Sequence, residues 1–100
     1  MRTNDIDMNQ AVFTTKNVMN NKMPIVRVTH DHDGSWQFFD AVSTNSFENA
    51  MLVSLKNIID TDSSIIEVIN IGEGHRAERE EKNKPWTISS FEEENEDDET

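Results

Sequence analysis

Residues 24–39, which read PIVRVTHDHDGSWQFF, decide the fold. Residues 24–30 are rich in β-branched side chains, and Pro24 suits the first position of a strand. Residues 35–39 alternate, so that Trp36 and Phe38 share one face. Between the two runs, Asp33 and Gly34 supply the positive φ that a tight turn needs. The stretch therefore predicts a β-hairpin.

The residues before the hairpin predict a strand and a helix. Residues 11–15 read AVFTT and are typical of a short strand. Residues 16–22 are compatible with a short helix that ends near Asn20 and Asn21, and Pro24 prevents it from continuing.

The residues after the hairpin alternate between strand and helix signals. Residues 50–53 fit a strand or the start of a helix, and we favour a strand. Ser54 is suited to cap a helix that begins at Leu55. Asp62 or Ser63 is suited to cap a second short helix, which we expect over residues 64–70 because its isoleucines recur at helical spacing.

Two further strands complete the expected fold. Residues 74–80 predict a polar edge strand, and residues 85–88 a last strand. The sequence thus predicts an α+β fold, in which a small antiparallel sheet carries two or three short helices on one face.

Charge is distributed unevenly along the chain. Its 100 residues include 20 acidic and 9 basic side chains, for a formal net charge of −11, and seven of the acidic ones lie in residues 91–100. We therefore expect a disordered N-terminus over residues 1–9, one α+β domain over residues 10–89, and a disordered acidic tail over residues 90–100.

Composition excludes several classes of function. The chain has no cysteine, which rules out disulfides and thiolate chemistry. It shows neither a signal peptide nor an apolar run of membrane-spanning length, so we expect a cytoplasmic protein without a membrane partner. The excess of acidic residues disfavours nucleic acid and favours another protein, a basic one, as the partner.

No catalytic motif is recognisable. A Gly-x-Ser-x-Gly nucleophile elbow is missing, and residues 72–74 lack the following lysine of a phosphate-binding loop. The sequence predicts a protein that is not an enzyme and that needs no cofactor.

The candidate binding residues belong to the expected sheet. With Trp36 and Phe38 on one face, Phe39 lies on the other. If that second face is uncovered, Phe39 joins Ile25 in an exposed apolar patch of the kind that binds partners. The sequence leaves open which face is exposed. The complete set of candidates is Ile25, Arg27, Phe39, Arg76 and Arg79.

His30 and His32 are candidates for a metal site. Histidines two residues apart on a strand point the same way and are able to share an ion. The pair borders a tight turn, however, where that geometry is lost and where Asp and Gly occur for conformational reasons. A solvated turn is therefore the favoured interpretation, and His75 is the third histidine of the chain.

Several segments together resemble a known family. They are FTTK at residues 13–16, DGSWQF at 33–38, VSL at 53–55, the acidic break at 60–62, GHRAER at 74–79 and PW at 85–86. Over residues 11–88 the chain resembles small bacterial proteins of unknown function related to immunity proteins of polymorphic toxin systems. The resemblance implies a bacterial, cytoplasmic protein that neutralises a toxin, and it implies no catalytic residue.

Three hypotheses for the function follow. The favoured one is a non-enzymatic protein-binding module of the immunity type. The alternatives are a metal-binding protein or small metal-dependent enzyme that uses His30 and His32, and a structural or regulatory homo-oligomer that pairs exposed strand edges.

Overall fold

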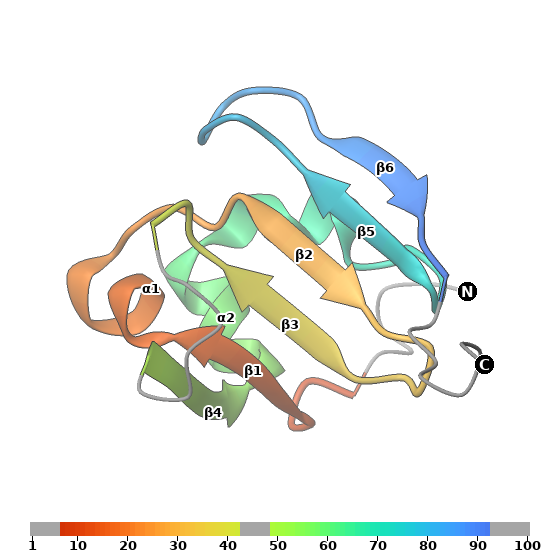
Figure 1. Ribbon diagram of the computed structural model, residues 1–100. Helices are drawn as coiled ribbons and strands as arrows, with labels where there is room; N and C mark the ends of the chain where they lie inside the picture. Colours follow the sequence, from red (N-terminus) through yellow and green to blue (C-terminus); the bar gives the residue numbers. More distant parts are fainter. Residues whose placement is uncertain (1–6, 43–48, 93–100) are drawn as a thin grey trace, which may run out of the picture.

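The computed structural model describes residues 7–42 and 49–92, and within them it shows a six-stranded sheet and three short helices (Figure 1). The strands are β1 (Ala11–Thr15), β2 (Arg27–His30), β3 (Trp36–Phe39), β4 (Ala50–Ser54), β5 (His75–Glu78) and β6 (Thr87–Ser90). The helices are α1 (Lys16–Asn21), α2 (Leu55–Thr61) and the 3₁₀ helix η3 (Ser63–Val68). The α+β class is confirmed.

The sheet is larger than expected and mixed in direction. Its strand order is β4-β1-β3-β2-β5-β6, and β1 runs parallel to β3 while the other pairs are antiparallel. The expectation of a purely antiparallel sheet is therefore wrong. So is the edge position of β5, because this strand pairs with β2 on one side and β6 on the other. The edges are β4 and β6.

The central hairpin is confirmed. β2 pairs with β3 in a register that places Val28 opposite Phe38. In the turn, the amide of Gly34 donates to the carbonyl of Asp31 at 3.0 Å, and Gly34 has a φ of +92°. β2, the first strand of the hairpin, begins at Arg27 and not at Pro24. The reason is that the amide of Ile25 donates to the Asp62 side chain and its carbonyl accepts from the Arg79 side chain, so neither joins the sheet.

Each helix begins at a side-chain cap. Thr15 accepts from the Val18 amide at the start of α1, and Ser54 accepts from the Asn57 amide at the start of α2. Asp62 ends α2 and caps η3 by accepting from the Ser64 amide. Each cap satisfies an amide that lacks a partner within the helix. The expected strand at residues 50–53 is confirmed, whereas the second helix is 3₁₀ and covers 63–68.

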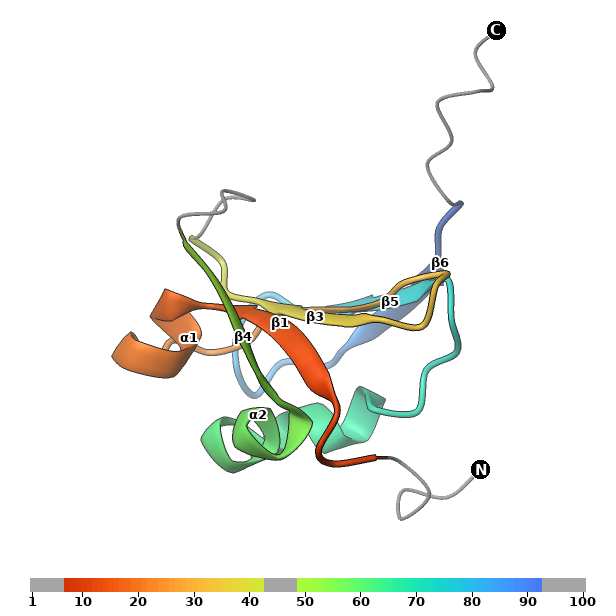
Figure 2. The same cartoon turned by 90° about the horizontal axis from the view of Figure 1, so that it is seen from below.

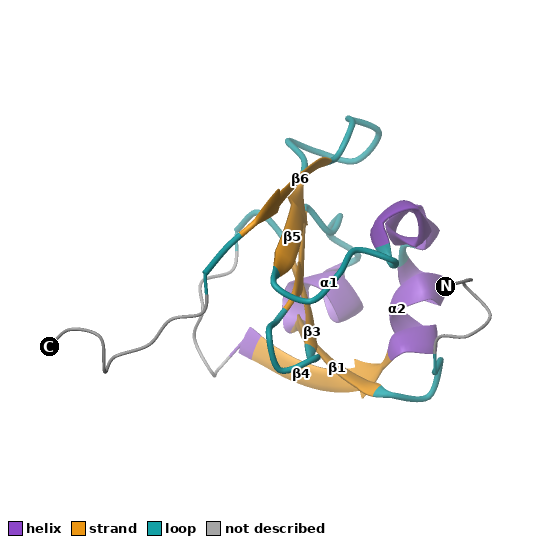
Figure 3. Ribbon diagram, turned by 90° about the vertical axis from the view of Figure 1, so that its right-hand side faces the viewer, coloured by secondary structure: helices purple, strands orange, loops and turns teal. Residues whose placement is uncertain are grey.

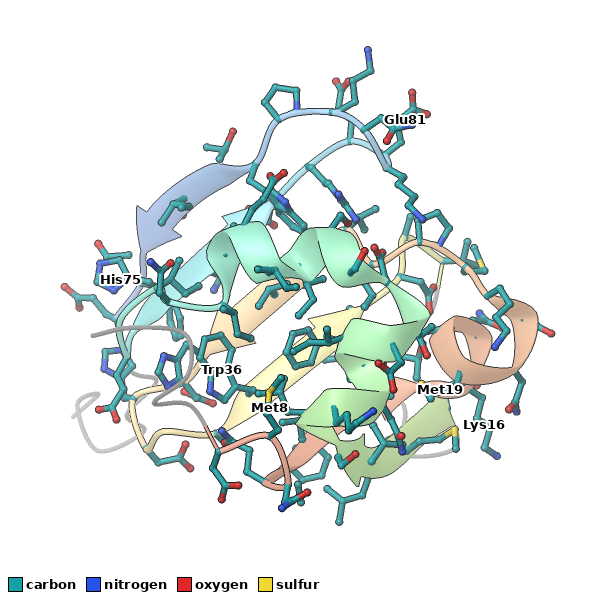
Figure 4. The ribbon with its side chains drawn as sticks, turned by 180° about the vertical axis from the view of Figure 1, so that it is seen from behind. Met8, Lys16, Met19, Trp36, His75 and Glu81 are labelled. Atoms are coloured by element: carbon teal, nitrogen blue, oxygen red, sulfur yellow. The ribbon has the colours of Figure 1, made fainter. Side chains whose placement is uncertain are left out.

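The helices lie on one side of the sheet and enclose the core (Figures 2 and 3). Viewed from that side, Trp36 lies on the sheet beneath the helical layer (Figure 4). The buried apolar residues are Val12, Val18, Ile25, Val28, Trp36, Phe38, Leu55, Ile58, Ile65, Val68, Ile69, Ile71 and Ala77. This layer leaves the opposite side of the sheet without a helical cover among the described residues.

Ordered contacts extend beyond residues 10–89 at both ends. At the amino-terminal end, the Lys56 amide donates to the carbonyl of Met8 at 3.0 Å. At the carboxyl end, β6 runs to Ser90, and the Phe91 amide donates to the carbonyl of Gly74 at 2.9 Å. Of the disorder predicted over residues 1–9 and 90–100, the parts at residues 1–6 and 93–100 lie outside the described residues. In the two described segments, no helix has the length and apolar character needed to cross a membrane.

Candidate functional site

The uncovered side of the sheet is the candidate site, and we call it the open face. Strand alternation and register decide which side chains it carries, because residues paired across two strands point to the same side. Trp36 and Phe38 point into the core, so their strand neighbours point outward. Carried through the register, the open face comprises Phe13, Arg27, Thr29, Gln37, Phe39, Leu52, Arg76 and Glu78.

One half of the open face is apolar. Phe13 on β1 lies directly opposite Leu52 on β4, and these side chains are 45% and 61% exposed. Adjacent exposed apolar side chains are a feature of surfaces that bind partners. Sequence reasoning missed both residues, although the alternation of buried Val12 and Thr14 with Phe13 carried the signal.

The other half of the open face is charged. Arg27 on β2 pairs with Glu78 on β5, with 3.2 Å between Nε and Oε2, and both side chains are 45% exposed. Arg76 lies two residues before Glu78 on β5, with its guanidinium 4.7 Å from the centre of the Phe91 ring. Its buried Nε has no hydrogen-bond partner among the described residues. Two of the predicted binding residues, Arg27 and Arg76, therefore lie in this half of the open face, and a third, Phe39, lies beside Arg27.

A shallow hollow lies at the end of β2, β3 and β5. It has a volume of about 290 Å³, and three of the predicted residues, Arg27, Phe39 and Arg79, contribute to its lining. Two of its polar residues are engaged in structural bonds. Asp40 accepts from the Thr15 hydroxyl at 2.5 Å, and Arg79 donates through Nε and Nη2 to the carbonyl of Ile25. The hollow, with the exposed pair of Arg27 and Glu78 in its lining, extends the surface of the open face.

Ile25 does not belong to the open face. Its side chain is completely buried in the core, and it lies before β2, so strand alternation does not govern its direction. Its amide donates to Asp62 and its carbonyl accepts from Arg79. The expected exposed patch of Ile25 and Phe39 is therefore wrong. Phe39 itself is half-buried, beside its partner Arg27.

Arg79 is likewise an internal residue. Its side chain is 2% exposed, and Nη2 donates to Oδ2 of Asp62 at 3.2 Å. Its guanidinium also lies 4.1 Å from the centre of the Trp86 ring. With these contacts Arg79 joins β5 to the cap of η3 and to the segment before β2, which is a structural role.

The histidines are engaged with the backbone. His30 stacks on Trp36 with 3.8 Å between ring centres, and its Nδ1 donates to the carbonyl of Ile71 at 2.8 Å. His32 donates through Nε2 to the carbonyl of Phe91 at 2.8 Å. His30 and His75 are cross-strand partners, but the described residues contain no group of three or more His, Cys, Asp or Glu placed to hold a metal ion.

Carboxylates gather where the β2–β3 turn meets the loop before β5, and we call this region the acidic end: Asp31, Asp33, Glu73 and Glu92. The turn and the loop are close, since a methyl group added at Gly34 would lie 3.4 Å from Oε2 of Glu73. The bond between His32 and Phe91 brings Glu92 to the same region. Hydrogen bonds from the backbone and hydroxyl of Ser35 lower the pKa of Asp33, which keeps this carboxylate charged.

Comparisons with known proteins do not assign this chain to a family. The chain matches no protein-family model, no curated protein and no solved structure. The arrangement of the open face and the acidic end is therefore the evidence on function.

Proposed function

We propose that this protein is a non-enzymatic protein-binding module whose open face is the recognition surface. One observation carries the proposal: Phe13 and Leu52 are direct neighbours on a side of the sheet that no described helix covers, and about half of each side chain is exposed. An aromatic and an aliphatic side chain on β1 and β4, with Arg27 two strands away on β2, have the composition of an interface centre with a charged rim.

Charge supports a basic protein as the partner. The chain has a formal net charge of −11, and the acidic end borders the open face where β2, β3 and β5 meet their loops. Such a field accelerates the approach of a basic surface and repels nucleic acid. Apolar contact at Phe13 and Leu52 then supplies the affinity.

The sequence resemblance supports a more specific form of the proposal. A bacterial, cytoplasmic immunity-type protein that neutralises a toxin needs a rigid surface and no catalytic group. The open face fits this role because it is built on paired strands, which hold its side chains in fixed positions.

The proposal is tested by capture of partners from host lysate on the full chain and on two matched variants. Phe13→Gln removes the aromatic ring from the open face, whereas Ile66→Gln removes an equally exposed apolar side chain, 45% in both cases, from η3 on the helical side. We expect a protein that the full chain and Ile66→Gln retain and that Phe13→Gln loses. Equal retention by both variants would exclude the open face as the binding surface.

A second comparison separates recognition by the open face from recognition by charge in the tail. A chain that ends at Glu92 lacks residues 93–100, which contain six acidic side chains, and keeps every described residue. If it retains the same protein, the domain recognises the partner. If it retains nothing, the tail does, and the open-face proposal fails.

A further inference from the structure

β4 is an edge strand, and its outer backbone groups pair with no strand among the described residues. The Leu55 amide donates to the carbonyl of Gln10 at 3.0 Å, and Val12 pairs with Val53 in the same register. Because hydrogen-bonded and non-hydrogen-bonded pairs alternate along antiparallel strands, the backbone of Met51 and Val53 faces β1. The amides and carbonyls of Ala50 and Leu52 and the amide of Ser54 therefore face outward. Within residues 7–42 and 49–92, no strand pairs with this side of β4.

The β4 edge lacks the features that usually prevent strand pairing. Residues 49–55 read NAMLVSL and contain no charge, no proline and no glycine. The two edges differ at their entry, because Pro85 lies two residues before β6 and no proline lies near β4. Charged residues stand two positions outside both strands, Glu48 and Lys56 for β4 and Glu92 for β6. The strand β4 itself is uncharged, so a second strand paired along Ala50–Ser54 meets no ion.

We propose that two copies of this chain pair through β4 around a two-fold axis at Leu52. An antiparallel pairing centred there places Leu52 opposite Leu52 of the second copy, and the two residues exchange two hydrogen bonds. On either side, the Ser54 amide of one copy reaches the Ala50 carbonyl of the other. The Ser54 carbonyl is not required, which matters because an N-cap residue commits its carbonyl to the helix.

The side chains of β4 favour a second copy as the occupant of this edge. The outward-facing positions 50, 52 and 54 are symmetric about Leu52, so a two-fold axis satisfies them without a shift in register. On the open face, the two leucines then lie in one row between the two phenylalanines at position 13, and the leucines contact each other at the axis while the face itself stays uncovered. A charged foreign strand would place its charges against this uncharged, apolar edge.

The mass of the full chain in solution provides the first test. Light scattering coupled to gel filtration should give twice the monomer mass of 11.5 kDa at high concentration. Leu52→Lys places a charge on the axis and should restore the monomer mass. Ile88→Lys changes a comparably exposed aliphatic side chain on the other edge strand, β6, and should remain dimeric. A monomeric wild type, or a dimer that only Ile88→Lys disrupts, would overturn the proposal.

Disulfide trapping fixes the register, because the chain has no cysteine of its own. In the proposed pairing the two Cα atoms at position 52 are about 5.5 Å apart, within the range that a disulfide spans. Leu52→Cys should form a covalent dimer under mild oxidation, and Ile88→Cys should do so at least tenfold more slowly. Equal rates would refute the β4 interface. Whether or not the β4 strands pair, the open face stays accessible. The capture experiment with Phe13→Gln therefore tests the proposed function separately from the dimer.

Discussion

Arg79 and Asp62 form an ion pair in the interior of the domain, with 3.2 Å between Nη2 and Oδ2 and side chains only 2% and 4% exposed. The two residues join three distant segments. Arg79 holds the carbonyl of Ile25, and Asp62 holds its amide and caps η3. The segment before β2, the end of β5 and the start of η3 are therefore fixed to one another by a single polar cluster.

Removal of the arginine should destabilise the domain strongly. Arg79→Met keeps much of the apolar stem but removes the buried cation of Asp62 and leaves only the half-exposed Lys82, 4.0 Å away, beside this carboxylate. Loss of one partner of a buried ion pair typically costs about 3–5 kcal/mol of unfolding free energy. Urea unfolding measures this cost. Lys56→Met is the control, because the Lys56–Asp60 pair is exposed and contributes at most about 0.5 kcal/mol. Similar losses in the two variants would contradict the structural role of Arg79.

The pH dependence of stability should contain a contribution from Asp62. Burial raises the pKa of this carboxyl. Hydrogen bonds from Ser64 and the Ile25 amide, together with the Lys82 charge, lower the pKa by more than burial raises it, so the pKa lies below its ordinary value of 3.8. The unfolded state then binds the proton more readily, and stability rises with pH. The contribution is complete above pH 3.8 and is lost as the pH falls through the folded-state pKa.

This dependence is measured by urea unfolding at a series of pH values down to the acid limit of folding. The slope of unfolding free energy against pH should be shallower below pH 3.8 for Asp62→Asn than for the wild type, because the amide does not titrate. Parallel slopes would show that Asp62 has the same pKa in the folded and unfolded states.

Any side chain at position 74 should destabilise the domain. Its φ is +79°, and an added methyl group would lie 2.7 Å from Cε1 of His32. We expect Gly74→Ala to cost about 1–3 kcal/mol through backbone strain and displacement of the His32 ring. Gly72→Ala is a matched control, since its methyl group would meet His75 at an ordinary 3.6 Å. Equal stability of the two variants in thermal or urea unfolding would disprove the close packing at Gly74.

Phe91 should be part of the folded domain and contribute to its stability. Its amide binds the carbonyl of Gly74, its carbonyl binds His32, and its ring covers the Arg76 guanidinium. A chain ending at Ser90 should therefore be about 1–3 kcal/mol less stable than one ending at Glu92. Identical unfolding midpoints for these two truncations would place the boundary before Phe91.

Local signals predicted the local structure well. The hairpin follows from β-branched runs around Asp33 and Gly34, and the caps at Ser54 and Asp62 follow from side chains that bind nearby amides. What the sequence did not predict depends on partners far along the chain. The parallel contact of β1 with β3, the inner position of β5 and the burial of Ile25 all arise from long-range contacts, which no local pattern encodes.

The candidate site was predicted in part for the same reason. Arg27, Phe39 and Arg76 lie on the sheet, as expected, and Arg27 and Phe39 are direct cross-strand partners. Leu52 and Phe13 escaped prediction because their exposure depends on the register of β1 with β4 and on which side the helices cover. Arg79 was wrongly predicted to be a surface binding residue. Its guanidinium is buried because it pairs with Asp62, 17 residues earlier in the chain.

The parallel contact between β1 and β3 also constrains the order in which the sheet assembles. β1 precedes both of its partners in the chain and lies between β3 and β4, so its first pairing needs residues 36–39 and its second needs residues 50–54. The β2–β3 hairpin closes a short loop and is the earliest pairing available, because loop closure costs less entropy over short separations. We therefore expect the sheet to assemble from the hairpin outward, with β1 adding to β3 and β4 completing that side of the sheet.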